Sequence, residues 1–574
     1  MKRTNRGTIG VALGAVVSLA VAACGGGGSS STSTSAAPAA KGGTLTMLNL
    51  GPTEHLDPQR VYLGADILMG SRVFARSLTT FAPNDKDAKP VPDLATDTGQ
   101  ILDDGKTWKF TLKDGVKWQD GKDITCADLK YGISRTFATD VITGGPNYIL
   151  AFLDIPAGAD GSSQYKGPYT KVGQDLFDKA VTCDGKTITY RFNKPWKDFN
   201  QATAGLLAFA PFRQDQDKGA QSDLAVFSTG PYMLEGAFDK DKGGKFVRNP
   251  NWSESTDPIR KAYPDVIQYV NGVQTETIYQ RLIADQGDDK TAISAVQAAP
   301  SSLPQIESNA GAKGRSVLVN TPYVDYIQPN MKSPVFTNPK ARQALAMATS
   351  RDAYSTAYGG KSIMDPTYSM CSKLLRCYKE FNPFGAPTSG DTAGAKKVLQ
   401  DAGLTLPVPV TVVYRKRPTA DKALQALKEQ WDAAGFNVTL EGVTDKYYAT
   451  IQGPAYANRD AFWAGWGADW PSGSTIMPAL FDGRVNISAG GAGQDYGYFN
   501  DDEVNAAIDK AFLIADDAAR EKAWADIDEM IAKKGGSVAM GQQKFTFMWG
   551  SSVKNFSSNP SMAAYPDLAL VAVK

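Results

Sequence analysis

A strand–helix–strand pattern around residue 420 constrains the fold of this chain more than any other feature. Residues 408–414 are a β-branched run suited to a buried strand, and apolar residues then recur at helical spacing over 423–434. Gly435, a residue typical of helix ends, precedes a return to strand-like alternation over 436–440. Two strands joined by one helix predict a parallel pair with a right-handed crossover.

Other patterns add strands early in the chain and helices late in it. Strand-like alternation with long intervening loops is present at 44–48, 108–112 and 188–192. Helical patterns begin at Asn338-Pro339 and recur around 504–511 and 524–531. The chain has 574 residues, and a domain typically takes about 100–200, so we expect two or three domains of α+β and α/β type.

The amino-terminal segment is typical of an export signal. A basic start without acidic residues precedes 9–23, a run of 15 apolar or small residues. That is short of the ~20 residues that span a bilayer, and it fits a signal-peptide core. The run ends in Val-Ala-Ala-Cys, which resembles the bacterial lipobox, with cleavage before Cys24 and lipid on its sulfur. An ordinary signal peptide that happens to end in cysteine is the alternative.

The residues that follow support a lipid anchor. Residues 25–41 are rich in Gly, Ser, Thr and Ala, the composition of a flexible tether. No later segment reaches 18 uninterrupted apolar residues. We therefore predict a signal peptide over 1–23, a lipidated cysteine and tether over 24–41, and a location on the outer face of the bacterial cytoplasmic membrane.

Four cysteines remain once Cys24 is acylated. Outside the cytoplasm an even number of cysteines suggests disulfides. Cys371 and Cys377 are the obvious pair because the loop between them is short, which leaves Cys126 with Cys183. Four free buried thiols are the alternative. The sequence contains no C-x-x-C motif, so neither a zinc knuckle nor a thioredoxin motif is available.

Composition excludes several functions. The chain has 61 basic and 60 acidic residues, and removal of the signal takes away three basic residues, which leaves a net charge of −2. A nucleic-acid-binding protein usually carries a basic stripe, and we expect none here. Catalytic triads and histidine-rich metal sites need placed imidazoles, and the chain has a single histidine, His55. The composition therefore disfavours both. The Walker-like tail Gly360-Lys361-Ser362 lacks its earlier glycine, where Ser355 stands. We predict no nucleotide site, cofactor or metal.

The segment 462–471 is the most unusual in the chain. It places Trp463, Trp466, Trp470 and the carboxylate of Asp469 within eight residues, interspersed with glycines. A pocket for a neutral or zwitterionic ligand needs apolar walls and few fixed charges, and a buried carboxylate can hold a cationic amine. The alternative is structural: the tryptophans belong to the core and the aspartate caps a turn.

Several spaced segments together resemble the family 5 extracellular solute-binding proteins, the peptide/nickel group that supplies ABC importers. The resemblance covers roughly 42–574, in the family's order. The matching segments are Gly42-Gly43-Thr44-Leu45, Leu56-Asp57-Pro58, Pro92-Asp93-Leu94-Ala95, Leu102-Asp103-Asp104-Gly105, Gly115-Val116-Lys117-Trp118, Thr229-Gly230-Pro231-Tyr232, Arg248-Asn249-Pro250-Asn251-Trp252, Ala341-Arg342-Gln343-Ala344-Leu345 and Leu399-Gln400-Asp401-Ala402-Gly403-Leu404.

This resemblance implies a mixed α/β, two-lobed class II periplasmic-binding-protein fold with a subdomain inserted in lobe I. Two chain crossings form its hinge, and the lobes close on the ligand. The implied boundaries are 42–84 for the first part of lobe I, 85–222 for the inserted subdomain, 223–318 for the second part of lobe I, 319–540 for lobe II and 541–574 for the third part of lobe I.

The resemblance also implies a binding site. Asp469 stands where peptide binders of the family carry an aspartate that pairs with the ligand's terminal ammonium, and Trp466 matches a pocket-lining tryptophan. Gly465 is similar to a residue whose backbone meets the peptide. Further candidates for the pocket wall are Trp470, Trp463, Tyr148 and Tyr496.

The resulting functional prediction is a monomeric, lipid-anchored binding component that captures oligopeptides and delivers them to an ABC permease and its ATPase. No bond changes in this mechanism. Alternatives are an oligosaccharide ligand in the same fold, a ligand-sensing adaptor without import, and a surface hydrolase with Asp469 and Asp495 as its carboxylates.

Overall fold

The computed structural model describes residues 39–83, 85, 87–158, 161–488 and 490–574. The predicted signal peptide, Cys24 and most of the tether lie outside these residues. Within them the helices are α1 Gly64–Val73, α2 Cys126–Arg135, α3 Tyr148–Phe152, α4 Gln174–Ala180, α5 Phe199–Gly205, α6 Thr275–Ala284, α7 Leu303–Ser308, α8 Ala310–Lys313, α9 Pro339–Ala348, α10 Arg351–Tyr358, α11 Thr392–Asp401, α12 Pro418–Ala433, α13 Tyr447–Gln452, α14 Met477–Phe481, α15 Gly483–Asn486, α16 Asp502–Leu513 and α17 Asp517–Lys533.

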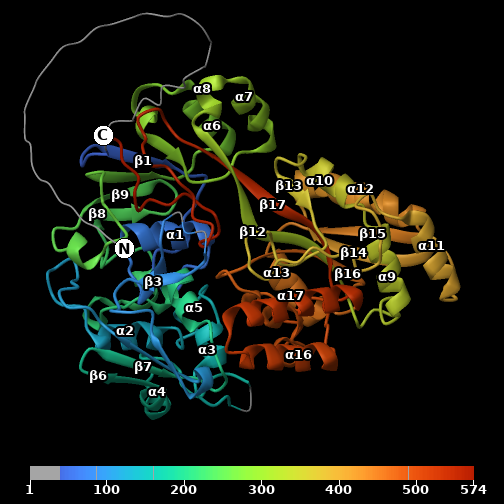
Figure 1. The fold of residues 1–574 in the computed structure, drawn as a ribbon, viewed down its shortest axis with the longest axis horizontal. Helices are drawn as coiled ribbons and strands as arrows, with labels where there is room; N and C mark the ends of the chain where they lie inside the picture. Colours follow the sequence, from blue (N-terminus) through green and yellow to red (C-terminus); the bar gives the residue numbers. More distant parts are fainter. Residues whose placement is uncertain (1–38, 84, 86, 159–160, 489) are drawn as a thin grey trace, which may run out of the picture. The chain divides into compact units, whose positions relative to one another are not determined.

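The strands of the described residues form two large sheets and two small ones (Figure 1). The five-stranded sheet has the order β11 (Ala292–Ser294), β1 (Thr44–Leu48), β10 (Val266–Val270), β9 (Gly243–Arg248), β8 (Tyr232–Asp239). The six-stranded sheet has the order β13 (Met364–Pro366), β17 (Val538–Met548), β12 (Ser316–Pro329), β16 (Ala461–Gly467), β14 (Val408–Arg415), β15 (Phe436–Val443). The small sheets are β2 (Thr79–Phe81) with β3 (Pro90–Pro92), and β4 (Gln100–Leu102), β5 (Thr107–Thr111), β7 (Thr187–Arg191), β6 (Val181–Asp184).

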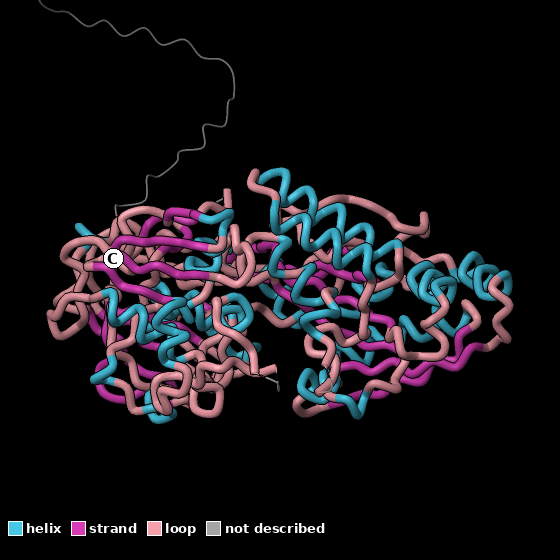
Figure 2. Tube along the Cα trace, turned by 90° about the horizontal axis from the view of Figure 1, so that it is seen from below, coloured by secondary structure: helices cyan, strands magenta, loops and turns pink. Residues whose placement is uncertain are grey.

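Each large sheet contributes to its own hydrophobic core. The first core draws on segments between 45 and 295 and between 553 and 573, together with Trp470. The second core draws on segments between 324 and 540. We call the parts of the chain around these cores lobe I and lobe II. Figure 2 shows strands of each part (magenta) with helices (cyan) beside them.

The predicted strand–helix–strand unit is confirmed. β14 and β15 pair in parallel with Val408 opposite Phe436, and α12 connects them. The apolar face of α12, including Leu427 and Trp431, is fully buried against the second core. The helix begins at Pro418, earlier than its apolar repeat, because proline is well suited to the first turn of a helix. The predicted strands at 44–48, 108–112 and 188–192 correspond to β1, β5 and β7, and the three predicted helices to α9, α16 and α17.

Two long strands join the lobes. β12 and β17 pair antiparallel within the six-stranded sheet, and the end of β17 reaches lobe I, where Trp549 bridges to Ile293. The predicted boundaries at 318/319 and 540/541 fall inside these two strands. The domain boundaries as a whole remain a prediction.

Both predicted disulfides are present. Cys126 at the start of α2 is bonded to Cys183 in β6, and Cys371 is bonded to Cys377. Among the described residues, no helix is both long enough and apolar enough to cross a membrane.

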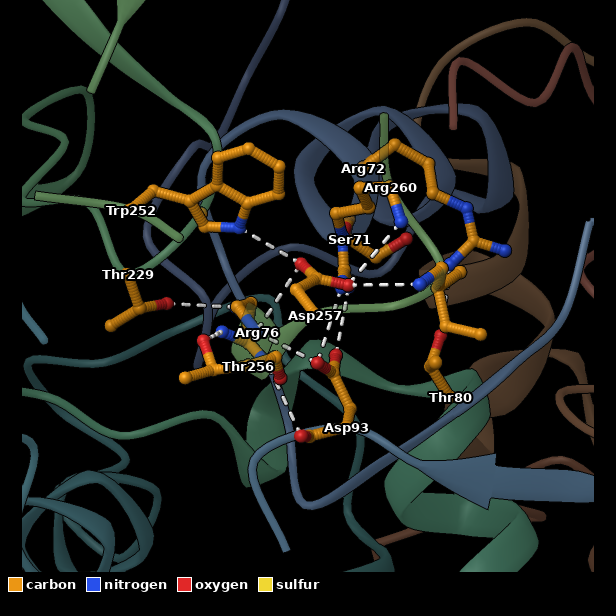
Figure 3. A network of polar contacts seen from close by, with 12 residues as sticks. Ser71, Arg72, Arg76, Thr80, Asp93, Thr229, Trp252, Thr256, Asp257 and Arg260 are labelled. Atoms are coloured by element: carbon orange, nitrogen blue, oxygen red, sulfur yellow. Dashed lines mark hydrogen bonds and ion pairs between the residues drawn. The ribbon is translucent and has the colours of Figure 1, made fainter. Parts of the chain in front are cut away.

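A buried ionic network ties distant parts of lobe I together (Figure 3). Asp93 lies between two arginines, with its carboxylate oxygens 2.7 Å from Arg76 Nε and 2.8 Å from Arg260 Nη2. Asp257 accepts a bond of 2.9 Å from Arg260 and one of 3.0 Å from the indole of Trp252. Burial alone would raise the pKa of Asp93, but the two arginine charges outweigh it and hold the pKa well below its usual range.

This network fixes the position of α1. Arg76 and Arg72 lie at the carboxyl end of that helix, and Arg72 pairs with Asp567 at 2.8 Å near the end of the chain. Both ion pairs are almost completely buried, so neither charge can be left without its partner. Segments near residues 93, 257 and 567 therefore hold α1 in one orientation.

We predict that Asp93→Asn destabilises the protein by about 3–5 kcal/mol, because it leaves two buried arginine charges without a full counter-charge. Urea unfolding followed by tryptophan fluorescence measures the effect. Asp154→Asn is the matched control, since Asp154 is exposed, and it should change the free energy of unfolding by less than about 0.5 kcal/mol. Equal stability of the two variants would contradict the structural role of the network.

Candidate ligand-binding site

The tryptophan-rich segment is held by strand pairing. β16 pairs antiparallel with β12, so that Gly465 lies opposite Asp325 and Gly467 opposite Tyr323. A side chain at Gly467 would place its Cβ 2.3 Å from the ring of Tyr323. Only glycine therefore leaves room for this ring to lie over β16 at that position. On the other edge, β14 pairs with β16 only as far as Phe462. The edge of β16 beyond Phe462 is therefore not covered by β14.

Asp469 follows β16 and receives hydrogen bonds from both lobes. Its Oδ2 accepts from the hydroxyl of Tyr62 at 2.8 Å, from the hydroxyl of Tyr148, and from Thr475 Oγ1 at 3.4 Å. The hydroxyl of Thr475 also accepts from the backbone N–H of Asp469 at 3.1 Å. Within the described residues, Oδ1 of Asp469 has no hydrogen-bond partner, so this carboxylate retains a free acceptor.

Burial dominates the electrostatics of this carboxylate. It raises the pKa of Asp469 to about 6, although the bonds from Tyr148, Tyr62 and Thr475 act in the opposite direction. The pKa values of Tyr62 and Tyr148 are raised well above 10 by burial and by the negative charge of Asp469. The tyrosines therefore stay protonated at neutral pH and act as donors. Among the residues that the structure describes, no cationic side chain forms an ion pair with the aspartate.

Asp469 lines a cavity of about 210 Å³ between the lobes. Residues of lobe I come from the start of α1, the end of α5 and a segment near the chain end. Residues of lobe II come from β12, the end of β16 and the segment directly after it. The lining residues are Tyr62, Leu63, Gly64, Ile67, Gly205, Leu206, Tyr323, Trp466, Gly467, Ala468, Asp469, Met562 and Ala563. The cavity wall is mostly apolar and aromatic, with one free carboxylate oxygen, which suits an apolar ligand with a cationic group.

The sequence-predicted site residues fall into two groups. Trp466 and Asp469 line the cavity, and Tyr148 reaches it by contacting Asp469 with its hydroxyl. Trp470 is buried in the first core, with its ring centroid 4.7 Å from that of Tyr148, and it does not line the cavity.

The remaining candidates pack behind the cavity wall in lobe II. Trp463 donates from Nε1 to the hydroxyl of Tyr354 at 2.8 Å, and Tyr496 stacks near Tyr448 with ring centroids 5.9 Å apart. Both Trp463 and Tyr496 are buried in the second core. The backbone N–H of Gly465 donates to the hydroxyl of Tyr448 at 3.3 Å, so this glycine lies on the strand edge beside the cavity wall.

Several cavity residues were not expected from the sequence. Tyr62, Leu63, Tyr323 and Met562 come from segments far from the tryptophan-rich stretch. Tyr62 follows one of the family-like segments, Leu56-Asp57-Pro58, which is the one signal that could have indicated it. The contacts of the others depend on how the two lobes meet.

A buried polar cluster joins the lobes beside the cavity. Asp198 of lobe I pairs with Arg520 at 2.6 Å and accepts from Ser474 at 2.7 Å and from Ser472 at 3.0 Å. Glu521 accepts from Ser472 at 2.5 Å. Burial and the negative charge of Asp198 raise the pKa of Glu521 to about 7. The cluster therefore holds one buried acid that is protonated near neutral pH.

Two residues considered for other chemistry have structural partners. His55 contacts Asp223 through Nδ1 at 2.8 Å. Asp495 is buried in lobe II, where it accepts from Gln328 at 2.7 Å and from the backbone of Phe499 at 2.9 Å. In the part of the chain that the structure describes, no group of three or more His, Cys, Asp or Glu side chains could hold a metal ion.

A family model described as "Bacterial extracellular solute-binding proteins, family 5 Middle" matches residues 89–487, more than half of the chain. The chain belongs to this family. Its fold is the mixed α/β, two-lobed fold of periplasmic binding proteins, as the resemblance in sequence implied. Family 5 solute-binding proteins are extracytoplasmic transport binding proteins and not enzymes, so the hydrolase alternative is wrong.

Individual relatives agree with this assignment. The glutathione-binding protein GsiB of Salmonella typhi is 23% identical over 412 residues, which cover 69% of this chain and 70% of the relative. A probable peptide ABC transporter periplasmic-binding protein of Sinorhizobium fredii is 26% identical, with coverage of 56% of each chain. The solved structure of clavulanic acid biosynthesis oligopeptide binding protein 2 has a TM-score of 0.84 at 26% identity, covering 93% of this family 5 protein and 96% of that chain.

We predict that Glu521→Gln flattens the pH dependence of stability. The native state holds the proton of Glu521 up to about pH 7, whereas an unfolded carboxyl loses it near 4.5, so unfolding becomes easier as pH rises between these values. The variant should gain about 1–3 kcal/mol relative to wild type at pH 8 and little at pH 5. Unfolding in urea across pH 5–8 measures this. The exposed Glu429→Gln serves as control, and parallel pH profiles for all three proteins would contradict the assignment.

Proposed function

We propose that this family 5 protein captures oligopeptides between its two lobes and delivers them to a membrane permease and its ATPase. One observation carries the proposal: the carboxylate of Asp469 lines an aromatic cavity with one oxygen free and no cationic side chain paired with it. A terminal ammonium of a peptide would bind there and supply the missing positive charge. A structural relative also supports a peptide ligand: the solved structure of Haemophilus influenzae OppA contains the peptide RPPGFSPFR.

The strand edge beside the cavity suits an extended peptide backbone. β16 carries the segment from Trp463 to Gly467, and β14 does not pair with it beyond Phe462. The hydroxyls of Tyr447 and Tyr448 contact the backbone of Trp463 and Gly465 on this edge. An added strand that displaced them would form backbone hydrogen bonds there, independent of the peptide's side chains. This explains how one site could accept peptides of different sequence.

Closure of the lobes is part of the proposed mechanism. Tyr62 and Tyr148 belong to lobe I, whereas Asp469 belongs to lobe II. The Asp198–Arg520 pair likewise connects the two lobes. Opening about β12 and β17 would separate these donors from their acceptors and expose Asp469 to water. Closing around a peptide restores the hydrogen bonds and buries the ligand, so a binding equilibrium alone drives capture.

We propose further that the protein acts as a monomer anchored by lipid at Cys24. The lipobox-like sequence before Cys24 and the tether composition of 25–41 support this placement. More than one acyl chain is needed for stable anchoring, because a single chain binds membranes reversibly. The two lobes would then face the permease from the outer surface of the cytoplasmic membrane.

Asp469→Asn should weaken the binding of peptides with a free amino terminus by thirty-fold or more, about 2–5 kcal/mol, because the terminal ammonium loses its counter-charge. Native mass spectrometry of residues 25–574 before and after denaturation identifies co-purified peptides, and calorimetry with the synthetic peptides gives the affinities. Amino-terminally acetylated peptides should bind wild type and variant equally. The exposed Asp445→Asn is the matched control and should leave both affinities unchanged.

The pH dependence of binding is a second readout of the same contact. The carboxylate form of Asp469 pairs with ammonium, so affinity should fall as pH is lowered through about 6, by roughly tenfold per unit below that value. This dependence should be absent from Asp469→Asn. Peptides that bind the variant as tightly as wild type would refute the ammonium contact, and a ladder of hexose masses would replace the peptide proposal with a sugar ligand.

Cys24→Ala should move the protein from the membrane fraction to the soluble extracytoplasmic fraction in a bacterial host that acylates lipoproteins. Labelling with radioactive palmitate should be lost at the same time, because the acylated sulfur is gone. Ser29→Ala, within the tether, should change neither result. A wild-type protein that carries no label would show that the amino-terminal segment is an ordinary signal peptide.

A further inference from the structure

A second cavity adjoins the central one on the side of lobe I. It has a volume of about 190 Å³ and is lined by Glu54, His55, Val61, Tyr62, Leu63, Asp66 and Gly144. Tyr62 and Leu63 line both cavities, so the two spaces adjoin at these residues. A ligand bound at Asp469 would therefore lie next to two residues that also line this acidic cavity.

The carboxyl group of Asp66 has no partner in the structure. Asp66 lies in the first turn of α1, is 9% exposed and lines the cavity, yet no described residue donates a hydrogen bond or forms an ion pair with its side chain. Buried polar groups normally have such a partner. Burial and the negative charge of Glu54 raise the pKa of Asp66 to about 7.

Other buried acids of the chain differ from Asp66 in this respect. Asp93 and Asp567 are paired with arginines, and Asp325 accepts from the hydroxyl of Tyr354 at 2.8 Å. Of these four acids, only Asp66 has no hydrogen-bond or ion-pair partner among the described residues, and it lines the acidic cavity.

The nearby basic groups are engaged elsewhere. His55 lines the cavity but directs Nδ1 to Asp223 at 2.8 Å, and Arg60 lies 3.4 Å from the same carboxylate. Glu54 is exposed and has no ion-pair partner among the described residues. Among the described residues, the two carboxyl groups of the cavity have no ion-pair partner. Its other walls are His55, whose Nδ1 is directed to Asp223, and Val61, Tyr62, Leu63 and Gly144. This combination suits the aliphatic stem and charged end of a lysine or arginine.

We propose that the acidic cavity is a subsite for a cationic side chain of the bound peptide, with Asp66 as its main contact and Glu54 at its rim. This inference rests on the proposed function, because it takes the peptide's amino terminus to be held at Asp469. The subsite selects among peptides rather than deciding whether peptides bind. A lysine or arginine side chain that passes Tyr62 gives Asp66 the partner that it lacks.

Competition between matched peptides tests the proposal. The probes are alanine peptides of two to five residues that carry one lysine, arginine or norleucine at each position in turn. For at least one position, wild type should bind the lysine or arginine peptide about tenfold or more tightly than the norleucine peptide, the factor typical of one charge-assisted hydrogen bond. Asp66→Asn should lose this preference and bind the norleucine peptide as well as wild type does.

Controls separate the subsite from the main site. Glu54→Gln changes an exposed residue that folding does not require, and it should reduce the preference by a smaller factor. Asp445→Asn should retain the preference in full. If wild type binds lysine and norleucine peptides equally at every position, the subsite proposal is overturned while peptide binding stands. If no peptide of any series binds, the proposed function fails as well. Should Asp66→Asn fail to fold, the wild-type series and Glu54→Gln still decide the question.

Discussion

The ion pairs buried in lobe I are the constraint on which the binding site depends. Asp93 accepts from Arg76 and Arg260, and Arg72 pairs with Asp567, in an interior that excludes water. Because an unpaired charge there would be very costly, each segment that carries one must be in place. Since Arg72 lies in the last turn of α1 and Arg76 follows shortly after that helix, the amino-terminal end of α1 is fixed too. That end places Tyr62 and Leu63 in the cavity wall, so the network shapes the site without contacting it.

Three buried carboxylates show how the electrostatic environment of the two cavities differs from that of the core of lobe I. Asp93 in the core of lobe I has two arginine partners. Asp469 in the central cavity has only neutral donors among the described residues, and Asp66 in the adjoining acidic cavity has no partner among them. Burial raises the pKa of both cleft acids, because nothing positive offsets the loss of water. A cationic ligand would supply that charge.

The sequence was most informative where a pattern is local. The parallel pair of β14 and β15 around α12 follows from periodicity within 36 residues, and the disulfides follow from cysteine number and spacing. It was less informative about the tryptophans. Trp463 and Trp466 are three residues apart in β16, and residues an odd number apart in a strand point to opposite faces, so only one of them could line the cavity. Both tryptophans were predicted to line the pocket wall.

By itself, the sequence determined the local elements, the family and the presence of an aspartate after a glycine-rich strand, because all of these are written in short stretches of residues. The tertiary structure alone decided which groups surround that aspartate. Tyr62 and Tyr148 are 407 and 321 residues away from Asp469 in the chain. No local pattern encodes a contact across such a separation, since it forms only when both cores are packed and the lobes meet. The unpartnered state of Asp66 has the same origin, because an empty neighbouring space exists only in the folded protein.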